Sequence, residues 1–315
     1  RQGLAWSEIE DVDNLNLNTI EGFIYESFTT GVIINGDGTT ILDVFYRRDS
    51  IDVSITMTEG VASVTATVNE EGGNYAFTHT YANENNTLTS AETFSVKYGA
   101  RVVLTYVLHT DSEGNTGYTW AGWTGGVEQE GDTFYIIAGV TDFAIQANAT
   151  NNTYKIYYNG NLGSYEDDTT DPAEIVTRYS QDAIYNRPVT LLANRFERVG
   201  YEFAGWATQA GSEEVVYDNL AQIDPYLFKD DLELYAVWTP ITYNIEYNAN
   251  GGSGSYDGVT GIEYDQEITL YDNADGEFSM TGYTWNGWTY TNDAGEVVTV
   301  SPDDLTVENL TAVKG

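Results

Sequence analysis

The chain has 315 residues, which is more than one small domain usually contains, so we expect two to four domains. It carries 49 acidic and 12 basic residues, and the resulting net charge of −37 disfavours nucleic acid and anionic lipid surfaces as partners. No stretch of 18 or more apolar residues occurs, so we expect no membrane insertion by this segment, and without cysteine it forms no disulfide. The 41% of hydrophobic residues, with Val, Ile, Thr and Tyr dominating the patterned stretches, predict a folded, mainly β protein.

The first predicted unit, residues 1–48, contains an incomplete sequence pattern. Glu21-Gly22-Phe23-Ile24-Tyr25 has the Gly-aromatic-x-aromatic start of a motif that is complete further along the chain, and the alternation of Leu42, Val44 and Tyr46 predicts a closing strand. No segment before Gly22 has the pattern of an opening strand. We therefore expect that this unit either continues before Arg1 or receives a strand from a neighbouring molecule.

The second predicted unit, residues 49–150, opens on a strand with Ile51, Val53 and Ile55 on one face. It contains the complete motif Gly117-Tyr118-Thr119-Trp120-Ala121-Gly122-Trp123. A closing strand is predicted from the alternation of Phe143, Ile145, Ala147 and Ala149.

The third predicted unit, residues 151–239, has the same order of patterns. Its opening strand carries Tyr154, Ile156 and Tyr158, and its motif reads Gly200-Tyr201-Glu202-Phe203-Ala204-Gly205-Trp206. Leu232, Leu234, Ala236 and Trp238 share one face of the predicted closing strand.

The last predicted unit, residues 240–315, opens on Tyr243, Ile245 and Tyr247 and contains Gly282-Tyr283-Thr284-Trp285-Asn286-Gly287-Trp288. Leu310, Ala312 and Lys314 occupy the register of Leu234, Ala236 and Trp238. This register predicts that the last unit also ends in a closing strand.

The complete motifs begin at residues 117, 200 and 282, at offsets of 83 and 82, so the chain is a tandem repeat. The closing strand of each unit runs almost directly into the opening strand of the next one. Linkers such as Arg48-Asp49-Ser50 and Thr239-Pro240 are too short to act as flexible tethers, and we expect a semi-stiff, head-to-tail rod.

The third and last units resemble the Listeria–Bacteroides repeat of the internalin B-repeat type. Asn250-Gly251-Gly252, the three Gly-Tyr-x-aromatic-x-Gly-Trp motifs and Leu234-Tyr235-Ala236-Val237-Trp238 carry this resemblance. The unit at 49–150 lacks the Asn-Gly-Gly turn and the closing Trp, and is the most divergent. Thr29-Thr30-Gly31 and Asn35-Gly36-Asp37-Gly38-Thr39, followed by Val44-Phe45-Tyr46-Arg47-Arg48, resemble the end of a mucin-binding-protein-like repeat.

The resemblance implies small β-grasp-like domains within long bacterial surface proteins, where such repeats serve as spacers and adhesive stalks. It brings no catalytic residues with it. The resemblance therefore implies an extracellular or cell-surface location.

The aromatic residues of the repeated motif, which we call the corner, could form either a sugar-stacking platform or part of the core. Because each full unit repeats the set and its glycines permit close backbone approach, we favour the core interpretation. The corner residues are Gly117, Tyr118, Trp120, Gly122 and Trp123 in the first full copy, Gly200, Tyr201, Phe203, Gly205 and Trp206 in the second, and Gly282, Tyr283, Trp285, Gly287 and Trp288 in the third.

Catalytic and metal-binding patterns are weak throughout the sequence. The stretch Asp11-Val12-Asp13-Asn14 begins like a calcium loop but continues with Leu15 and lacks the required Gly and Glu. The acidic groups Asp167-Asp168 with Asp171, Asp230-Asp231 and Asp303-Asp304 leave loose calcium binding open as an alternative to plain solvation. His79 and His109 are the only histidines, and neither lies in a recognisable catalytic or metal motif. We expect no enzyme, no catalytic or metal site and no cofactor.

These observations favour a non-enzymatic structural or adhesive segment of a microbial surface or extracellular-fibre protein, serving as a stalk or fibre subunit. Its expected partners are neighbouring repeats or identical subunits. The alternative is a binding module that recognises carbohydrate or a host or surface protein through exposed loops.

Overall fold

A computed structural model describes residues 17, 19–33, 35–69, 75–169 and 172–314. These residues form strands and loops but no helix, so the prediction of a mainly β protein is confirmed for the described part of the chain. No helix in this part is long and apolar enough to cross a membrane. The chain divides into two compact units, residues 1–152 and 153–315, which are described separately below.

The first strands form an antiparallel ribbon, β1 (Phe23–Phe28) with β2 (Val44–Arg48). Its large side chains are poorly covered, since Phe45 is 50% exposed. The described residues do not confirm the resemblance to a mucin-binding-like repeat. The predicted lack of an opening strand before Gly22 and the calcium-like stretch at 11–14 concern residues outside those described.

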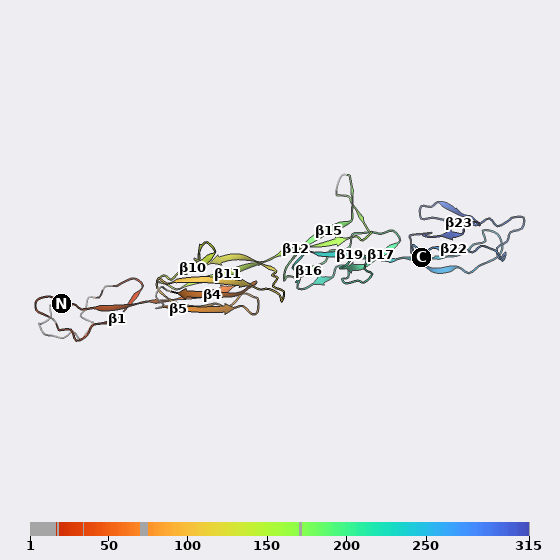
Figure 1. Cartoon of the computed structure of the whole chain (residues 1–315). Helices are drawn as coiled ribbons and strands as arrows, with labels where there is room; N and C mark the ends of the chain where they lie inside the picture. The colour runs from red at the N-terminus through yellow and green to blue at the C-terminus, as the bar shows by residue number, and fades with distance from the viewer. Residues whose placement is uncertain (1–16, 18, 34, 70–74, 170–171, 315) are drawn as a thin grey trace. The chain divides into compact units, whose positions relative to one another are not determined.

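Residues 50–151 form two packed sheets (Figure 1). One has the order β5-β4-β7-β10-β9 and the other the order β6-β3-β11-β8. The strands are β3 (Ser50–Met57), β4 (Val61–Asn69), β5 (Ala76–Ala82), β6 (Glu92–Lys97), β7 (Arg101–Leu108), β8 (Tyr118–Thr124), β9 (Glu128–Glu130), β10 (Thr133–Ile137) and β11 (Phe143–Asn151). Alternating apolar residues of β3, β4, β7 and β11 fill the space between the sheets, because successive side chains of a strand point to opposite faces.

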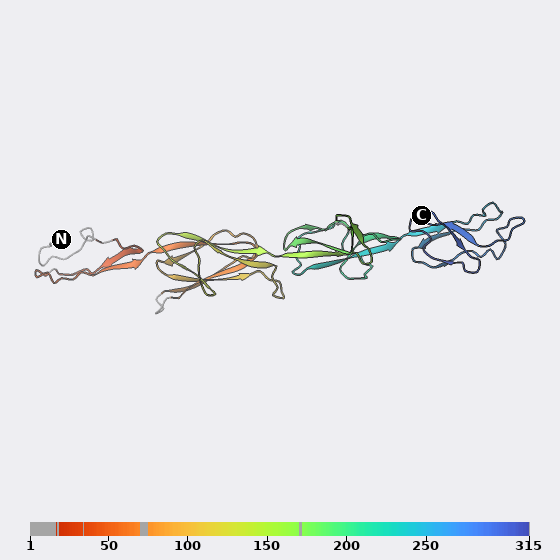
Figure 2. The ribbon, with the colours of Figure 1, turned by 90° about the horizontal axis from the view of Figure 1, so that it is seen from above.

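Residues 153–240 are built around one sheet of four strands in the order β15-β12-β19-β17, which Figure 2 shows from above. The closing strand β19 lies at the centre, parallel to β12 and antiparallel to β17. The strands are β12 (Thr153–Asn159), β13 (Tyr165–Asp167), β14 (Glu174–Val176), β15 (Arg178–Ile184), β16 (Val189–Thr190), β17 (Tyr201–Ala207), β18 (Gln222–Ile223) and β19 (Leu232–Pro240). Leu234 and Ala236 are fully buried beneath this sheet, and Trp238 packs against the same core.

Residues 242–314 form only two-stranded ribbons around a smaller core of Leu270, Val300 and Leu305. The strands are β20 (Thr242–Ile245), β21 (Val259–Glu263), β22 (Ile268–Thr269), β23 (Trp288–Thr291), β24 (Val297–Val300) and β25 (Thr306–Val307).

The predicted closing strand of the last unit is not formed, and this prediction was wrong. Residues 308–314 are irregular. Asp293 holds them by accepting hydrogen bonds from the Thr311 hydroxyl (2.6 Å) and the Ala312 amide (2.7 Å). The alternation is present in the sequence, but the Asp293 carboxylate, and not a neighbouring strand, accepts the hydrogen bond of the Ala312 amide.

The finer prediction of β-grasp-like domains in a rod is not confirmed. The segment at 49–150 has two sheets with a core between them, whereas the segment at 151–239 has one four-stranded sheet. The four-stranded sheet of 49–150, β6-β3-β11-β8, nevertheless has the same order and strand directions as β15-β12-β19-β17, with the closing strand parallel to the opening strand and antiparallel to the corner strand. The two segments therefore share this sheet and differ in the additional five-stranded sheet of 49–150.

Candidate functional site

The three full corner motifs lie in different environments. In the first, Tyr118 is buried, and Trp120 and Trp123 pack against the core of 49–150. Trp120 also stacks on Tyr106, with ring centroids 3.6 Å apart and planes at 8°. This copy is part of a core rather than an exposed aromatic platform.

In the second copy, Trp206 is 0% exposed and forms the centre of an aromatic cluster. Its ring centroid lies 4.9 Å from that of Tyr158 and 4.9 Å from that of Phe203. Burial raises the pKa of Tyr158 to about 12, which reflects the dry surroundings of this cluster. Trp206 therefore has no face available to a ligand.

The third copy is more open. Tyr283 is 74% exposed, and Trp285 and Trp288 are only partly buried. The residues from Gly282 to Gly287 form no strand, in contrast to the second copy, where β17 pairs with β19. The same motif is thus exposed where its partner strand is missing.

The start of the corner has a role that the sequence analysis missed, because it forms a joint with the following repeat. Gly200 has a φ of +76°, and a Cβ there would overlap the ring of Tyr264. Gly22 has a φ of +77°, and a Cβ there would overlap the ring of Tyr98. Both positions require glycine, because the backbone is left-handed there and a tyrosine ring of the next repeat occupies the space of a side chain.

The two joints share the same hydrogen bonds and ring geometry. In the Gly200 joint the Ile241 amide donates to the Gly200 carbonyl (2.9 Å) and the Tyr264 amide to the Ile241 carbonyl (2.9 Å). The Gly22 joint has the same backbone relay of two hydrogen bonds. The Asp49 amide donates to the Gly22 carbonyl and the Tyr98 amide to the Asp49 carbonyl, each at 2.8 Å. The rings of Tyr201 and Tyr264 pack edge to face, with centroids 5.9 Å apart and planes at 70°. The rings of Phe23 and Tyr98 pack in the same way, with centroids 5.9 Å apart and planes at 69°.

Polar contacts reinforce the second joint. The Tyr201 hydroxyl donates to Asp265 (2.7 Å), and the Asn309 amide donates to the other oxygen of this carboxylate (2.8 Å). These hydrogen bonds lower the pKa of Asp265, and the same carboxylate raises the pKa of Tyr201. Lys314 and Glu202 form an ion pair at 2.8 Å across the same joint.

The two joint tyrosines share a local backbone feature. Tyr98 precedes Gly99, and Tyr264 precedes Asp265, and both following residues have a positive φ. Tyr185-Asn186 has the same pattern in the third unit, with a φ of 55° at Asn186. The same residue pair also occurs elsewhere, as in Tyr158-Asn159 and Tyr243-Asn244, so the pair by itself does not single out the joint tyrosines.

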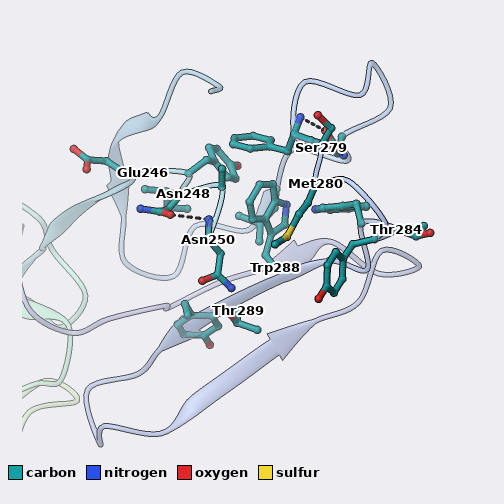
Figure 3. Close-up of a pocket in the computed structure, with 18 of the residues that line it drawn as sticks. Glu246, Asn248, Asn250, Ser279, Met280, Thr284, Trp288 and Thr289 are labelled. Atoms are coloured by element: carbon teal, nitrogen blue, oxygen red, sulfur yellow. Dashed lines mark hydrogen bonds between the residues drawn. The ribbon is translucent and has the colours of Figure 1, made fainter. Parts of the chain in front are cut away.

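A cavity of about 780 Å³ lies in the last repeat (Figure 3). One side is formed by residues 245–250, which begin at the last residue of β20, and the other by corner residues between Tyr283 and Trp288. Figure 3 shows Trp288 between the segment that carries Asn250 and the loop that carries Thr284. The Nε1 of Trp285 is buried and has no hydrogen-bond partner among the described residues.

The other candidate residues are used in local structure. Asp167 accepts hydrogen bonds from the amide and hydroxyl of Thr169, Asp231 accepts from the Lys155 amide, and Asp304 accepts from the Thr306 amide. Asp171 lies outside the described residues. Within the described ranges, no group of three or more His, Asp or Glu side chains is placed to hold a metal ion.

The two histidines have separate surroundings. His109 Nε2 lies 2.8 Å from the Asn83 carbonyl, and His79 packs against Tyr81 with ring centroids 4.4 Å apart. Neither arrangement includes a nucleophile or a carboxylate within hydrogen-bond distance among the described contacts.

Comparison with known proteins matches two segments of the chain, residues 154–237 and 243–312, to the Listeria-Bacteroides repeat domain. A protein of Evansella cellulosilytica described as a Gly-rich membrane protein is 23% identical over 182 residues, which is 55% of this chain. The match spans 19% of that protein's length. The Bacillus anthracis TIE protein overlaps 71% of this chain and 40% of its own chain at 8% identity, and its TM-score of 0.33 is too low to assign a fold.

Proposed function

We propose that this chain is a non-enzymatic spacer in a microbial cell-surface or extracellular protein, in which tandem repeats hold an adhesive or other functional part away from the surface. The observation that supports this most directly is the repeated joint. Two different pairs of repeats use a glycine, a backbone relay and an edge-to-face aromatic pair in the same geometry. A spacer needs such joints because independent domains on free linkers would reorient.

The high negative charge suits this role. Acidic residues outnumber basic ones by 49 to 12, and like charge keeps neighbouring chains apart at high local density. The match of two segments to a known repeat domain supports a modular chain in which such units follow one another.

The joint can be tested in residues 153–315, which form one compact unit. Replacement of Tyr264 by Ala removes the ring that covers Gly200, and we expect the repeats on either side to reorient more widely. Residual dipolar couplings measured by NMR in both repeats would report this as a loss of common alignment. Tyr283→Ala is a matched control, because it removes an exposed tyrosine from the same repeat.

An unchanged alignment in the Tyr264→Ala variant would argue against the spacer. It would mean that the joint contacts do not set the orientation of the repeats.

The rival function, carbohydrate binding by corner tryptophans, has less support. Trp206 is fully buried and Trp123 packs into a core, so neither offers a face to a sugar ring. The third copy, with Trp285 and Trp288, borders a cavity.

A further inference from the structure

The third repeat shows how the corner is closed when the repeat is complete. The closing strand β19 lies between β12 and β17, with Leu234 beside Tyr158 and Ala236 beside Trp206. Both neighbours bind it along the backbone, and its alternate side chains enter the core.

In the last repeat, no strand of the described residues occupies the position that β19 has in the third repeat. β20 has a neighbour on one side only, β21, and the corner residues from Gly282 to Gly287 are unpaired with any closing strand among the described residues. The 780 Å³ cavity occupies this place, since residues 245–247 and 283–288 line its two sides. These segments are the counterparts of β12 and β17.

The loop after the opening strand is built alike in both repeats. The Asn161 amide donates to the Asn159 side chain at 2.9 Å, and the Asn250 amide donates to the Asn248 side chain at 2.8 Å, as Figure 3 shows for the second pair. The φ values are 46° at Asn161 and 47° at Asn250. Asn250 is therefore the counterpart of Asn161.

Asn161 binds the closing strand directly, because its side-chain amide donates to the Ala236 carbonyl at 2.9 Å. Nothing among the described residues accepts a hydrogen bond from the corresponding amide of Asn250, which lines the cavity. A donor for the backbone of a closing strand is thus in place without the strand.

An acceptor is in place as well. Trp238 of the closing strand donates through Nε1 to the Gly160 carbonyl at 2.8 Å. The counterpart of Gly160 is Ala249, since each carbonyl also accepts the amide three residues later, at 2.8 Å in the third repeat and 2.9 Å in the last. Ala249 lines the cavity.

Of the chain's own residues 310–314, Leu310 lines the cavity, but none of these residues forms a strand. The Thr311 hydroxyl and the Ala312 amide are bound to Asp293, and Lys314 is paired with Glu202. By register, Lys314 stands where the closing strand of the third repeat has its tryptophan. A lysine cannot reproduce the partly buried indole ring that packs on Gly163.

We propose that the cavity of the last repeat binds an extended strand from another polypeptide chain, of the pattern Leu-x-Ala-x-Trp, inserted parallel to β20. The strand's backbone would pair with the exposed edge of β20, its alternate apolar side chains would cover Trp285 and Trp288, and its tryptophan would donate to the Ala249 carbonyl. The intervening residues lie on the opposite face of the strand, where the third repeat has half-buried Tyr235 and buried Val237. This inference goes beyond the spacer function, because a spacer needs no such partner.

The test uses the full chain and a fluorescent peptide with the sequence of residues 230–240, which contains the natural closing strand Leu232–Trp238. We expect saturable binding in fluorescence anisotropy. Asn250→Ala should weaken binding about tenfold, as expected for loss of one hydrogen bond to the strand. The matched variant Asn161→Ala should leave binding unchanged, because that amide is already engaged within the third repeat.

A second peptide, with Ala in place of the tryptophan, tests the pattern without altering the protein. It should bind at least tenfold more weakly than the natural sequence. Equal binding of the two peptides, or equal binding to the Asn250→Ala variant, would overturn the proposal.

Closure by the chain itself is also distinguishable. If the natural peptide binds only to an Ala312→Pro variant and not to the unmodified chain, residues 310–314 fill the cavity in solution and the proposal is wrong. Absence of peptide binding to both proteins overturns it too.

Discussion

Replacement of Trp206 by Ala should strongly destabilise the third repeat. The indole is 0% exposed and contacts a cluster that includes Tyr158, Phe196 and Phe203. Truncation of a buried large aromatic costs about 3–5 kcal/mol, through lost transfer free energy and the cavity that remains. In a domain of this size each kcal/mol lowers the melting temperature by roughly 4–8 °C, so we expect a fall of more than about 12 °C.

The measurement is thermal unfolding of the isolated segment 151–239, followed by near-ultraviolet circular dichroism. Trp206→Phe is the matched control. It keeps a ring in the core and removes an indole Nε1 that is buried without a partner, so its loss should be much smaller. A melting temperature that does not change in Trp206→Ala would refute the assignment of this residue to the core.

Three further predictions concern the joints, pH and metal ions. Gly200→Val should loosen the joint as Tyr264→Ala does, since a side chain there meets the tyrosine ring, and NMR alignment of the two repeats would show it. The pKa of Asp265 is lowered below its ordinary 3.8, so the stabilisation of the joint by this carboxylate is complete at neutral pH. It is lost as the pH falls below 3.8 through the lowered pKa. The joint of the Asp265→Asn variant should lack this pH dependence, and a pH profile identical to that of the unmodified chain would contradict the reasoning. The isolated segment 151–239 should fold without calcium, because its core is complete in Leu234, Trp206 and their neighbours, and circular dichroism with and without a chelator would reveal any requirement for the ion.

The sequence by itself determined the strands whose side chains alternate. The opening and closing patterns of the third repeat, from Tyr154 to Tyr158 and from Leu232 to Trp238, lie in strands of the structure because a period of two places alternate apolar residues on one face of a strand. The repetition of the corner likewise marked the places where aromatic side chains enter a core, as Trp206 does.

Tertiary structure decided the contacts between segments that are distant along the chain. The same corner is buried around Trp206 and open around Trp285, because burial depends on whether a strand fills the neighbouring position. Alternation at Leu310 and Ala312 could not predict the competition from Asp293, which holds this segment outside the sheet. The role of Gly200 was hidden for the same reason: a left-handed glycine is visible in a turn motif, but the Tyr264 ring that excludes every side chain there comes from the next repeat.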